Sequence, residues 1–312
     1  MTFNPGLSAR DRTSRDEKRA PWLAGVFTDL VTPFRDDRID EEAFVAMVER
    51  QIAAGARGVV VASGAAGERP TLRDGEASRL IALAVKTTNG RAKVVADAGS
   101  NATVFARRLV DEARGLGVDA VLVAPPWYNR PSQAGVLRHF ESIAEANSPP
   151  ILVWDCPART ALPLSIPTLQ HLAGLPGVAG IVDATGDMSR VSELRRLCPN
   201  WSLLSGHDPS TLGYLAQGGD GCLSLAANVC PDAVCAIDAA WALQDGREAR
   251  RVHDSVSDLM LLLGYDPAPA AAKLALSLEG FCRPDVRLPI TPCPEATQAR
   301  LLRALRTMRD LA

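Results

Sequence analysis

The chain lacks the features that mark several large classes of protein. In its 312 residues, no apolar run approaches the roughly 18 residues that a membrane-spanning helix needs. The formal net charge is only −2, so no charge excess favours nucleic acid or a membrane surface. Residues 1–20 are charged and without the apolar core of a secretory signal, and we expect them to form a flexible arm. The sequence therefore predicts no nucleic-acid partner and no membrane partner.

Cysteine and histidine are present without the spacings that disulfide or metal sites need. The seven cysteines are scattered, odd in number and without a C-x-x-C pair, which is typical of reduced thiols in a cytoplasmic protein. The four histidines show no H-E-x-x-H or comparable zinc spacing. Cys156 ends a predicted strand, where a nucleophile is one interpretation, but we interpret it as a packed free thiol. We therefore expect a cytoplasmic protein with no metal and no cofactor.

Eight short β-rich runs alternate with amphipathic helical segments from Gly25 onward. Each run ends in small or polar residues, as a buried parallel strand does at the rim of a sheet. Several of the helical segments between them end in glycine, the usual helix stop. The runs are residues 25–33, 58–64, 93–99, 120–126, 150–157, 178–185, 201–208 and 221–228.

Eight strand–helix units predict an α/β fold, a (β/α)8 TIM barrel. An open doubly wound sheet is the alternative, but it would normally carry a glycine-rich phosphate fingerprint, and the T-P-F-R stretch after the first strand is unlike one. More helical sequence follows the eighth strand than a closing barrel helix requires. We therefore assign residues 21–246 to the barrel and residues 247–312 to a C-terminal helical appendage, for which subunit contact is a hypothesis.

In such a barrel the active site lies at the carboxyl ends of the strands, where three loops are candidates. Residues 63–68 (S-G-A-A-G-E) could point backbone N–H groups at an anion, although spacing alone favours a tight turn. Residues 126–132 (P-W-Y-N-R-P-S) form an aromatic loop that is either functional or packed on a neighbour. Arg159 could clamp a carboxylate through its paired donors, or form an ordinary surface salt bridge.

Taken together and in this order, the motifs resemble the dihydrodipicolinate synthase/N-acetylneuraminate lyase family of class I aldolases. The similarity runs from about Gly25 to near the end of the chain. It implies a (β/α)8 barrel with C-terminal helices, a homotetramer or homodimer, and a reaction in which pyruvate or another 2-oxo acid forms a Schiff base with a lysine on the sixth strand. The motifs are G-x-x-G-E, P-W-Y-N-R-P-S-Q, P-A-R-T, G-I-x-D-A-T-G-D, L-S-G-H-D, G-G-D-G-C-L-S-L-A-A-N and R-L-P-I-T-P.

The lysine that the resemblance calls for is missing. Its position in residues 180–187 is Val182, and a valine side chain has no lone pair with which to form an imine. The chain has four lysines, and each falls in the predicted arm, in a predicted helix or at the start of the third strand, so none is an obvious substitute: Lys18, Lys86, Lys93 and Lys273.

Further positions depart from the family. Its proton-relay tyrosine on the fifth strand corresponds to Trp154, whose indole N–H can donate a hydrogen bond but cannot relay protons as a phenol does. Its hydroxyl residues after the second strand correspond to Ala65 and Ala66. The resemblance retains Tyr128 at a catalytic position, and it implies substrate-binding positions at Ala65, Ala66, Arg159, Gly206 and Leu223.

We therefore predict a protein that binds a small 2-oxo or hydroxy carboxylic acid at the barrel mouth and lacks the lysine for Schiff-base aldol chemistry. One alternative is a catalytically inactive or regulatory relative. Another is a lyase or aldolase that uses acid/base or metal-assisted chemistry, for which the rim offers five carboxylates with His207 beside them: Asp29, Asp97, Asp155, Asp183 and Asp208. Of these, Asp183 follows Val182 and is expected to turn out of the barrel. The least favoured alternative is ordinary synthase or lyase activity through an unforeseen amine.

Overall fold

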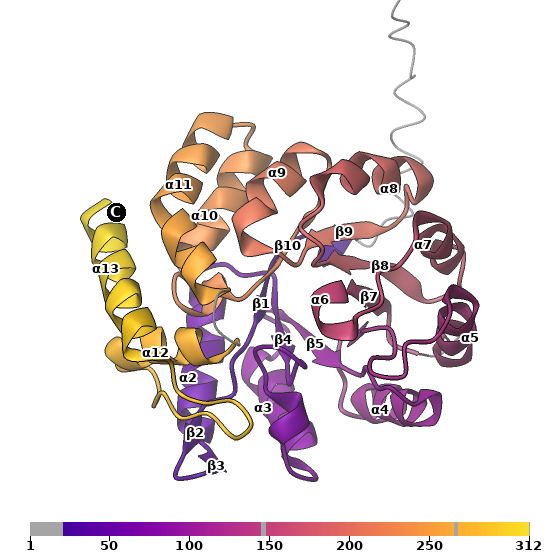
Figure 1. Ribbon diagram of the computed structural model, residues 1–312, viewed down its shortest axis with the longest axis horizontal. Helices are drawn as coiled ribbons and strands as arrows, with labels where there is room; N and C mark the ends of the chain where they lie inside the picture. The colour runs from indigo at the N-terminus through magenta and orange to yellow at the C-terminus, as the bar shows by residue number, and fades with distance from the viewer. Residues whose placement is uncertain (1–20, 145–147, 265–267, 312) are drawn as a thin grey trace, which may run out of the picture.

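The computed structural model describes residues 21–144, 148–264 and 268–311 (Figure 1). Eight parallel strands form a closed barrel in the order β1-β10-β9-β8-β7-β6-β5-β4, which confirms the predicted fold. A small antiparallel hairpin of β2 (Phe34–Arg35) and β3 (Arg38–Ile39) follows β1. The barrel strands are β1 (Gly25–Asp29), β4 (Gly58–Val61), β5 (Lys93–Asp97), β6 (Ala120–Val123), β7 (Ile151–Asp155), β8 (Val178–Asp183), β9 (Ser202–Ser205) and β10 (Gly221–Ser224).

Helices surround the strands on the outside of the barrel (Figure 1). Several of them begin at the side-chain caps that their sequences offer: Asp40 accepts a bond from the Ala43 N–H at 3.1 Å, and Ser132 accepts one from the Gly135 N–H at 3.2 Å. The barrel helices are α2 (Glu41–Ala53), α3 (Glu76–Thr88), α4 (Thr103–Gly115), α5 (Gln133–Ile143), α6 (Pro157–Thr160), α7 (Ile166–Ala173), α8 (Val191–Leu197), α9 (Thr211–Ala216) and α10 (Pro231–Ala242).

Three further helices follow, as the sequence predicts: α11 (Gly246–Leu263), α12 (Ala270–Leu278) and α13 (Glu295–Leu311). In Figure 1, α11 lies beside α10, and α13 lies at the edge of the molecule. The division of the chain at residue 247 stays a prediction, and the predicted arm, residues 1–20, lies outside the described residues. In the described part of the chain, no helix is both long enough and apolar enough to cross a membrane.

The apolar side chains form two cores, because successive strand residues point to opposite faces. On β8, Ile181 packs outward against the helices, whereas Val182 points into the barrel. On β7, Val153 and Trp154 divide in the same way. The inner core ends at the carboxyl ends of the strands, where polar side chains replace the apolar ones.

Candidate functional site

A cavity of about 770 Å³ opens at the carboxyl ends of the barrel strands. Its walls come from the end of β1, the loop after β4, β7 and α6, and the ends of β8, β9 and β10. The end of α11 supplies Met260, Leu261 and Gly264, and Ala268 follows. Five residues that the resemblance implied line this cavity: Ala65, Trp154, Arg159, Gly206 and Leu223.

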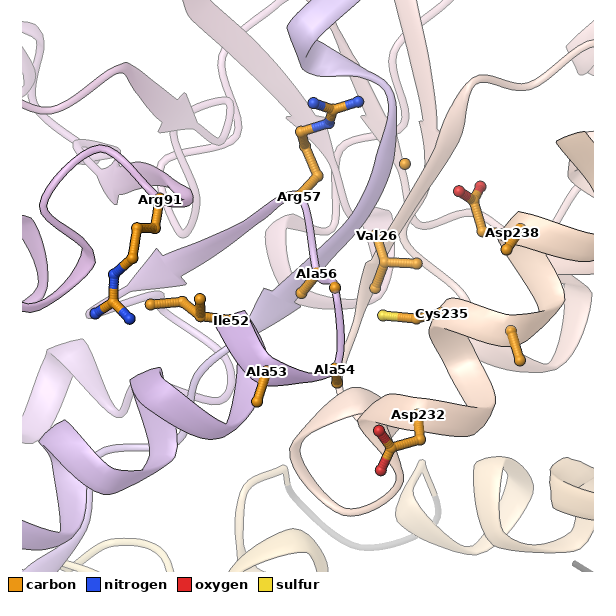
Figure 2. A pocket seen from close by; sticks show the side chains of 14 residues that line it. Val26, Ile52, Ala53, Ala54, Ala56, Arg57, Arg91, Asp232, Cys235 and Asp238 are labelled. Atoms are coloured by element: carbon orange, nitrogen blue, oxygen red, sulfur yellow. The ribbon is translucent and has the colours of Figure 1, made fainter.

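A second cavity, of about 680 Å³, lies at the opposite end of β1, between the end of α2 and α10 (Figure 2). Asp232, Cys235 and Asp238 project from α10 beside it. Its arginines are already used inside the protein: the Arg57 Nε donates to the Ala24 carbonyl at 3.1 Å, and Arg91 pairs with Glu49. None of the predicted site residues lies here, so we take the barrel mouth as the candidate site.

Asp29, the last residue of β1, is the buried carboxyl of the cavity. Its side chain is 5% exposed, and its Oδ1 has no hydrogen-bond partner among the residues that the structure describes. Burial raises the pKa of Asp29 to about 7, although hydrogen bonds from the Ser63 side chain and the Ala66 backbone and the charge of Arg159 act against the rise. Near neutral pH this carboxyl can therefore both give and take a proton.

Asp97, the last residue of β5, is buried like Asp29 but has both oxygens engaged. The Gly64 N–H donates to one oxygen at 2.7 Å, and the Gly99 N–H donates to the other at 2.8 Å. Burial raises the pKa of Asp97, and the Arg69 charge opposes the rise. Asp97 therefore holds two loops in place, and it is not in the lining of the cavity.

The loop of residues 63–68 uses its N–H groups internally. The Ser63 hydroxyl accepts from the Gly67 N–H at 3.1 Å and from the Ala65 N–H at 3.3 Å, while Gly64 bonds Asp97. A Cβ on Gly67 would lie 2.3 Å from the Ser63 nitrogen, so only glycine fits there. Because these donors are occupied, the geometry favours the tight-turn interpretation over an anion-binding loop.

Val182 and Trp154 are register partners on β8 and β7. Val182 is 1% exposed, and a Cβ on Gly206 would lie 2.9 Å from its Cγ1, so glycine allows this close packing. Ala66 is also buried, and neither Val182 nor Ala66 reaches the cavity lining. Beside them, Trp154, Cys156 and Ala184 line the cavity, and Gly206 lines it from the end of β9.

Asp183 points away from the barrel centre, as expected from the alternation of strand residues. It lies 3.5 Å from the Arg190 guanidinium, and Asp155, its register partner, lies 2.9 Å from the same group. His207 lines the cavity, with its Nδ1 2.8 Å from the Ser210 hydroxyl. Asp183 therefore serves an internal ion pair, while His207 remains at the cavity wall.

Arg159, in α6, lines the cavity with an exposed side chain. In the part of the chain that the structure describes, its guanidinium makes no hydrogen bond and no ion pair. The surface salt bridge that was the alternative for this residue is therefore not found. The guanidinium remains available to pair with an anionic ligand.

Tyr128 lies outside the cavity of its own chain. Its side chain is 91% exposed, on a backbone with φ of 68°. The next residue, Asn129, ties this loop to the neighbouring one through a bond from its Nδ2 to the Asn101 carbonyl at 2.8 Å. The structure therefore does not bring Tyr128 together with Trp154 and Arg159.

The lysines that the structure describes lie away from the cavity. Lys86 is exposed on α3, and the Lys93 Nζ pairs with Asp119 at 2.7 Å. Lys273 is fully buried on α12, where it bonds Glu68 and donates to the Asp285 carbonyl at 2.8 Å. Within residues 21–144, 148–264 and 268–311, no group of three or more metal-ligating side chains is arranged to hold a metal.

One contribution to the site was missed in the sequence, and one residue of the predicted rim, Asp208, has a structural role. The end of α11 covers part of the cavity. The apolar period of this segment predicts a helix but does not show that the helix reaches the barrel mouth. Asp208 has a further role: its Oδ2 accepts from the Leu225 N–H at 3.0 Å and the Ala226 N–H at 2.9 Å, which joins the loops after β9 and β10.

Known proteins resemble the chain along most of its length. A model of the Dihydrodipicolinate synthetase family matches residues 22–308. A 4-hydroxy-tetrahydrodipicolinate synthase of Phenylobacterium zucineum (strain HLK1) is 46% identical over 92% of this chain and 97% of its own. The solved synthase of Methylacidiphilum fumariolicum SolV superposes with a TM-score of 0.90 at 34% identity, covering 92% of this chain and 96% of its own. A chloride-inhibited dihydrodipicolinate synthase of Acinetobacter baumannii, solved with pyruvate, superposes with a TM-score of 0.89 at 31% identity, covering 92% and 99%.

Proposed function

Since the chain belongs to the dihydrodipicolinate synthetase family, we propose that it binds a small 2-oxo or hydroxy carboxylic acid at the barrel mouth without forming a Schiff base. The observation that carries this proposal is that the cavity contains the unpaired guanidinium of Arg159 but no lysine from the described part of the chain. A guanidinium binds a carboxylate through two parallel N–H donors. An imine needs a primary amine, and Val182 provides none.

The relative from Acinetobacter baumannii was solved with pyruvate, which supports a small carboxylic acid as the class of ligand. The ligand's carboxylate would pair with Arg159, and the walls of Trp154 and Leu223 would shield the pair from water. In this proposal Ala65 and Gly206 line the space for the ligand, while Ala66 and Val182 support the wall from behind. A homotetramer or homodimer and a cytoplasmic location remain predictions.

A second candidate is a lyase or aldolase that works by acid/base chemistry. Asp29 favours it, because its pKa of about 7 suits proton transfer near neutral pH. Asp29 would take a proton from a ligand held by Arg159 and return it to the product. The metal-assisted form of this candidate has no such support in the described residues. A catalytically inactive or regulatory relative would keep the binding and show no turnover.

The least favoured candidate is ordinary synthase activity, which the names of the relatives suggest. It would need an amine from outside the cavity, and Lys18 lies outside the described residues. Incubation with pyruvate, reduction with borohydride and mass spectrometry of the intact protein test for that amine. We expect no pyruvate adduct; a reduced adduct mapped to a lysine would overturn the proposal.

Binding itself is tested by calorimetry with small carboxylic acids on the wild type and on Arg159→Ala. Loss of a charged pair in a partly buried site should weaken binding about tenfold or more. Any acid that binds is then followed for consumption. Turnover without an adduct would establish the acid/base candidate, and binding without turnover would establish the inactive one.

A further inference from the structure

Asp29 presents a buried carboxyl oxygen that nothing in the described structure satisfies. The side chain lies on the same face of β1 as Phe27, inside the barrel, and it borders the cavity. It is 5% exposed, and its Oδ1 accepts no hydrogen bond from the described residues. An unsatisfied buried carboxyl oxygen destabilises the fold, so its retention needs a compensating role.

The other carboxyls near the barrel mouth have structural partners. Both oxygens of Asp97 accept backbone N–H groups, and Asp183 faces Arg190. The Oδ2 of Asp208 accepts two backbone N–H groups, which leaves its Oδ1 as the second unpartnered oxygen of the cavity. The Arg159 charge acts on Asp29, whereas the nearby charge that acts on Asp208 is that of His207, so Asp29 is the better-placed acceptor for a ligand held by Arg159.

The cavity that holds Asp29 also holds Arg159, whose guanidinium has no partner in the described residues. The two side chains are close enough for the Arg159 charge to influence Asp29. One wall of the cavity therefore offers a hydrogen-bond acceptor with negative charge, and another offers a planar cation. A ligand that satisfies both while Asp29 is ionised must carry a carboxylate and, near it, a hydrogen-bond donor.

We infer that the ligand is a small carboxylic acid with an ammonium or hydroxyl group on the carbon next to the carboxylate, with this donor on Asp29 and the carboxylate on Arg159. The inference rests on the proposed function for the carboxylate contact with Arg159; it keeps the hydroxy acids, adds amino acids and excludes 2-oxo acids, because a 2-oxo acid has only an acceptor at that carbon. A carbonyl oxygen placed against the ionised Asp29 would be repelled. The apolar walls, including Trp154 and Leu223, strengthen both polar contacts by excluding water.

Matched acids of equal length test this directly. Pyruvate, L-lactate and L-alanine differ only at the carbon next to the carboxylate, and 2-oxoglutarate, 2-hydroxyglutarate and L-glutamate form a longer series for the large cavity. Calorimetry on the full chain at about pH 8.5 keeps Asp29 ionised. In at least one series, we expect the hydroxy or amino acid to bind about ten- to a hundredfold more tightly than the 2-oxo acid. If the hydroxy acid binds more tightly than the amino acid, the donor to Asp29 is a hydroxyl group; if the amino acid binds more tightly, the donor is an ammonium group.

Variants assign the preference to Asp29. Asp29→Ala should abolish it, whereas Asp29→Asn, which keeps an acceptor but removes the charge, should abolish a preference for the amino acid and retain part of one for the hydroxy acid. Asp208→Asn tests the competing acceptor, and Asp74→Asn, at an exposed carboxyl away from the cavity, is the matched control; neither should remove the preference. Circular dichroism confirms that each variant is folded. A preference that survives Asp29→Ala, or that disappears with Asp208→Asn alone, contradicts the inference.

The outcomes separate this inference from the proposed function. If the 2-oxo acids bind as tightly as their partners and Arg159→Ala weakens them, the proposed function stands and the inference is wrong. If no acid of either series binds, the proposed function fails and the inference fails with it.

Discussion

Val182 occupies the carboxyl half of β8 with its side chain in the inner core, opposite Trp154. If this is the position of the family's lysine, Val182→Lys should supply the missing amine. Burial lowers the pKa of a lysine and leaves more of it neutral and nucleophilic, at a cost in stability of roughly 1–3 kcal/mol. We expect the variant, alone or with Trp154→Tyr, to gain a borohydride-reducible pyruvate adduct in intact-mass measurements.

Val182→Met is the control, because it has similar length and no amine. A folded Val182→Lys variant, with or without Trp154→Tyr, that takes up no pyruvate would show that position 182 is not where the family places its lysine.

Asp29 should also make stability depend on pH. Its pKa rises from an ordinary 3.8 in the unfolded chain to about 7 in the folded one, so between these values the folded state holds a proton that the unfolded state releases. Stability from this group is therefore full below about pH 4 and is lost as the pH rises through about 7. Relative to Asp29→Asn, the wild type should lose up to about 4 kcal/mol across this window.

Urea unfolding of both proteins at a series of pH values measures this difference. The comparison isolates Asp29 from Asp155, whose pKa burial raises to about 6, and from His139, whose pKa burial lowers to about 4. Parallel stability curves for the two proteins would refute the expectation.

Some features of single residues could be predicted from the sequence, and others could not. Alternation along a strand predicted that Asp183 turns away from the barrel, and the lysine positions were readable directly. The hydrogen bonds of the Gly64 and Gly67 N–H groups could not be predicted, because Gly64 bonds a carboxyl 33 residues further along the chain. The unpaired state of Arg159 was not predictable either, since any neighbour could have supplied a salt bridge.

Asn228, in the short helical turn after β10, fixes the end of β1. Its Nδ2 donates to the Asp29 carbonyl at 2.7 Å and to the Leu225 carbonyl at 2.9 Å, and its Oδ1 accepts from the Val31 N–H at 3.1 Å. Asn228→Asp replaces the donor with an oxygen that faces two carbonyls. We expect a loss of about 2–4 kcal/mol in the free energy of unfolding and weaker binding of acids, because Asp29 loses its support.

Urea unfolding and calorimetry check both effects. Asn200→Asp, the same change at an exposed residue whose side chain makes no hydrogen bond in the described structure, should alter stability by no more than about 0.5 kcal/mol. Equal effects from the two substitutions would contradict a special role for Asn228.

At the level of elements, the eight strands were predictable as short apolar runs that end in polar residues, and most helices were predictable from their apolar period. The β2–β3 hairpin was not, since strands of two residues are too short to show one. The place of α11 over the barrel mouth depends on packing against α10, which a helical pattern alone does not reveal. Local pattern therefore predicted the barrel, and tertiary packing decided how its mouth is covered.

Lys273 links the C-terminal helices to the barrel. It is buried on α12 against Glu68 of the loop after β4, and the other Glu68 oxygen accepts the Arg287 N–H at 3.1 Å. Lys273→Met leaves the Glu68 charge buried without its cation, which should destabilise the protein by about 3–5 kcal/mol. Adding Glu68→Gln should restore part of this loss, as measured by urea unfolding.

Urea unfolding also tests whether the barrel and the C-terminal helices unfold as separate units, with the boundary near residue 247. All five tryptophans lie at or before residue 241, so their fluorescence reports the barrel, while circular dichroism at a helical wavelength reports the whole molecule. We expect the two transitions to coincide in the wild type, because α11 packs on α10 and α12 bonds the barrel loop. Separate transitions would show that the C-terminal helices unfold on their own.

The closure of the barrel also sets an order of events during synthesis. Gly25 of β1 pairs with Gly221 of β10, and the Asn228 side chain that holds Asp29 lies 199 residues further along the chain. At a rate of synthesis of roughly 5–20 residues per second, β10 is made about 10–40 s after β1. Until then one edge of β1 is unpaired and Asp29 has no fixed position. The candidate site is therefore among the last features of the nascent chain to form, and chaperones that shield strand edges should matter most before residue 228 emerges.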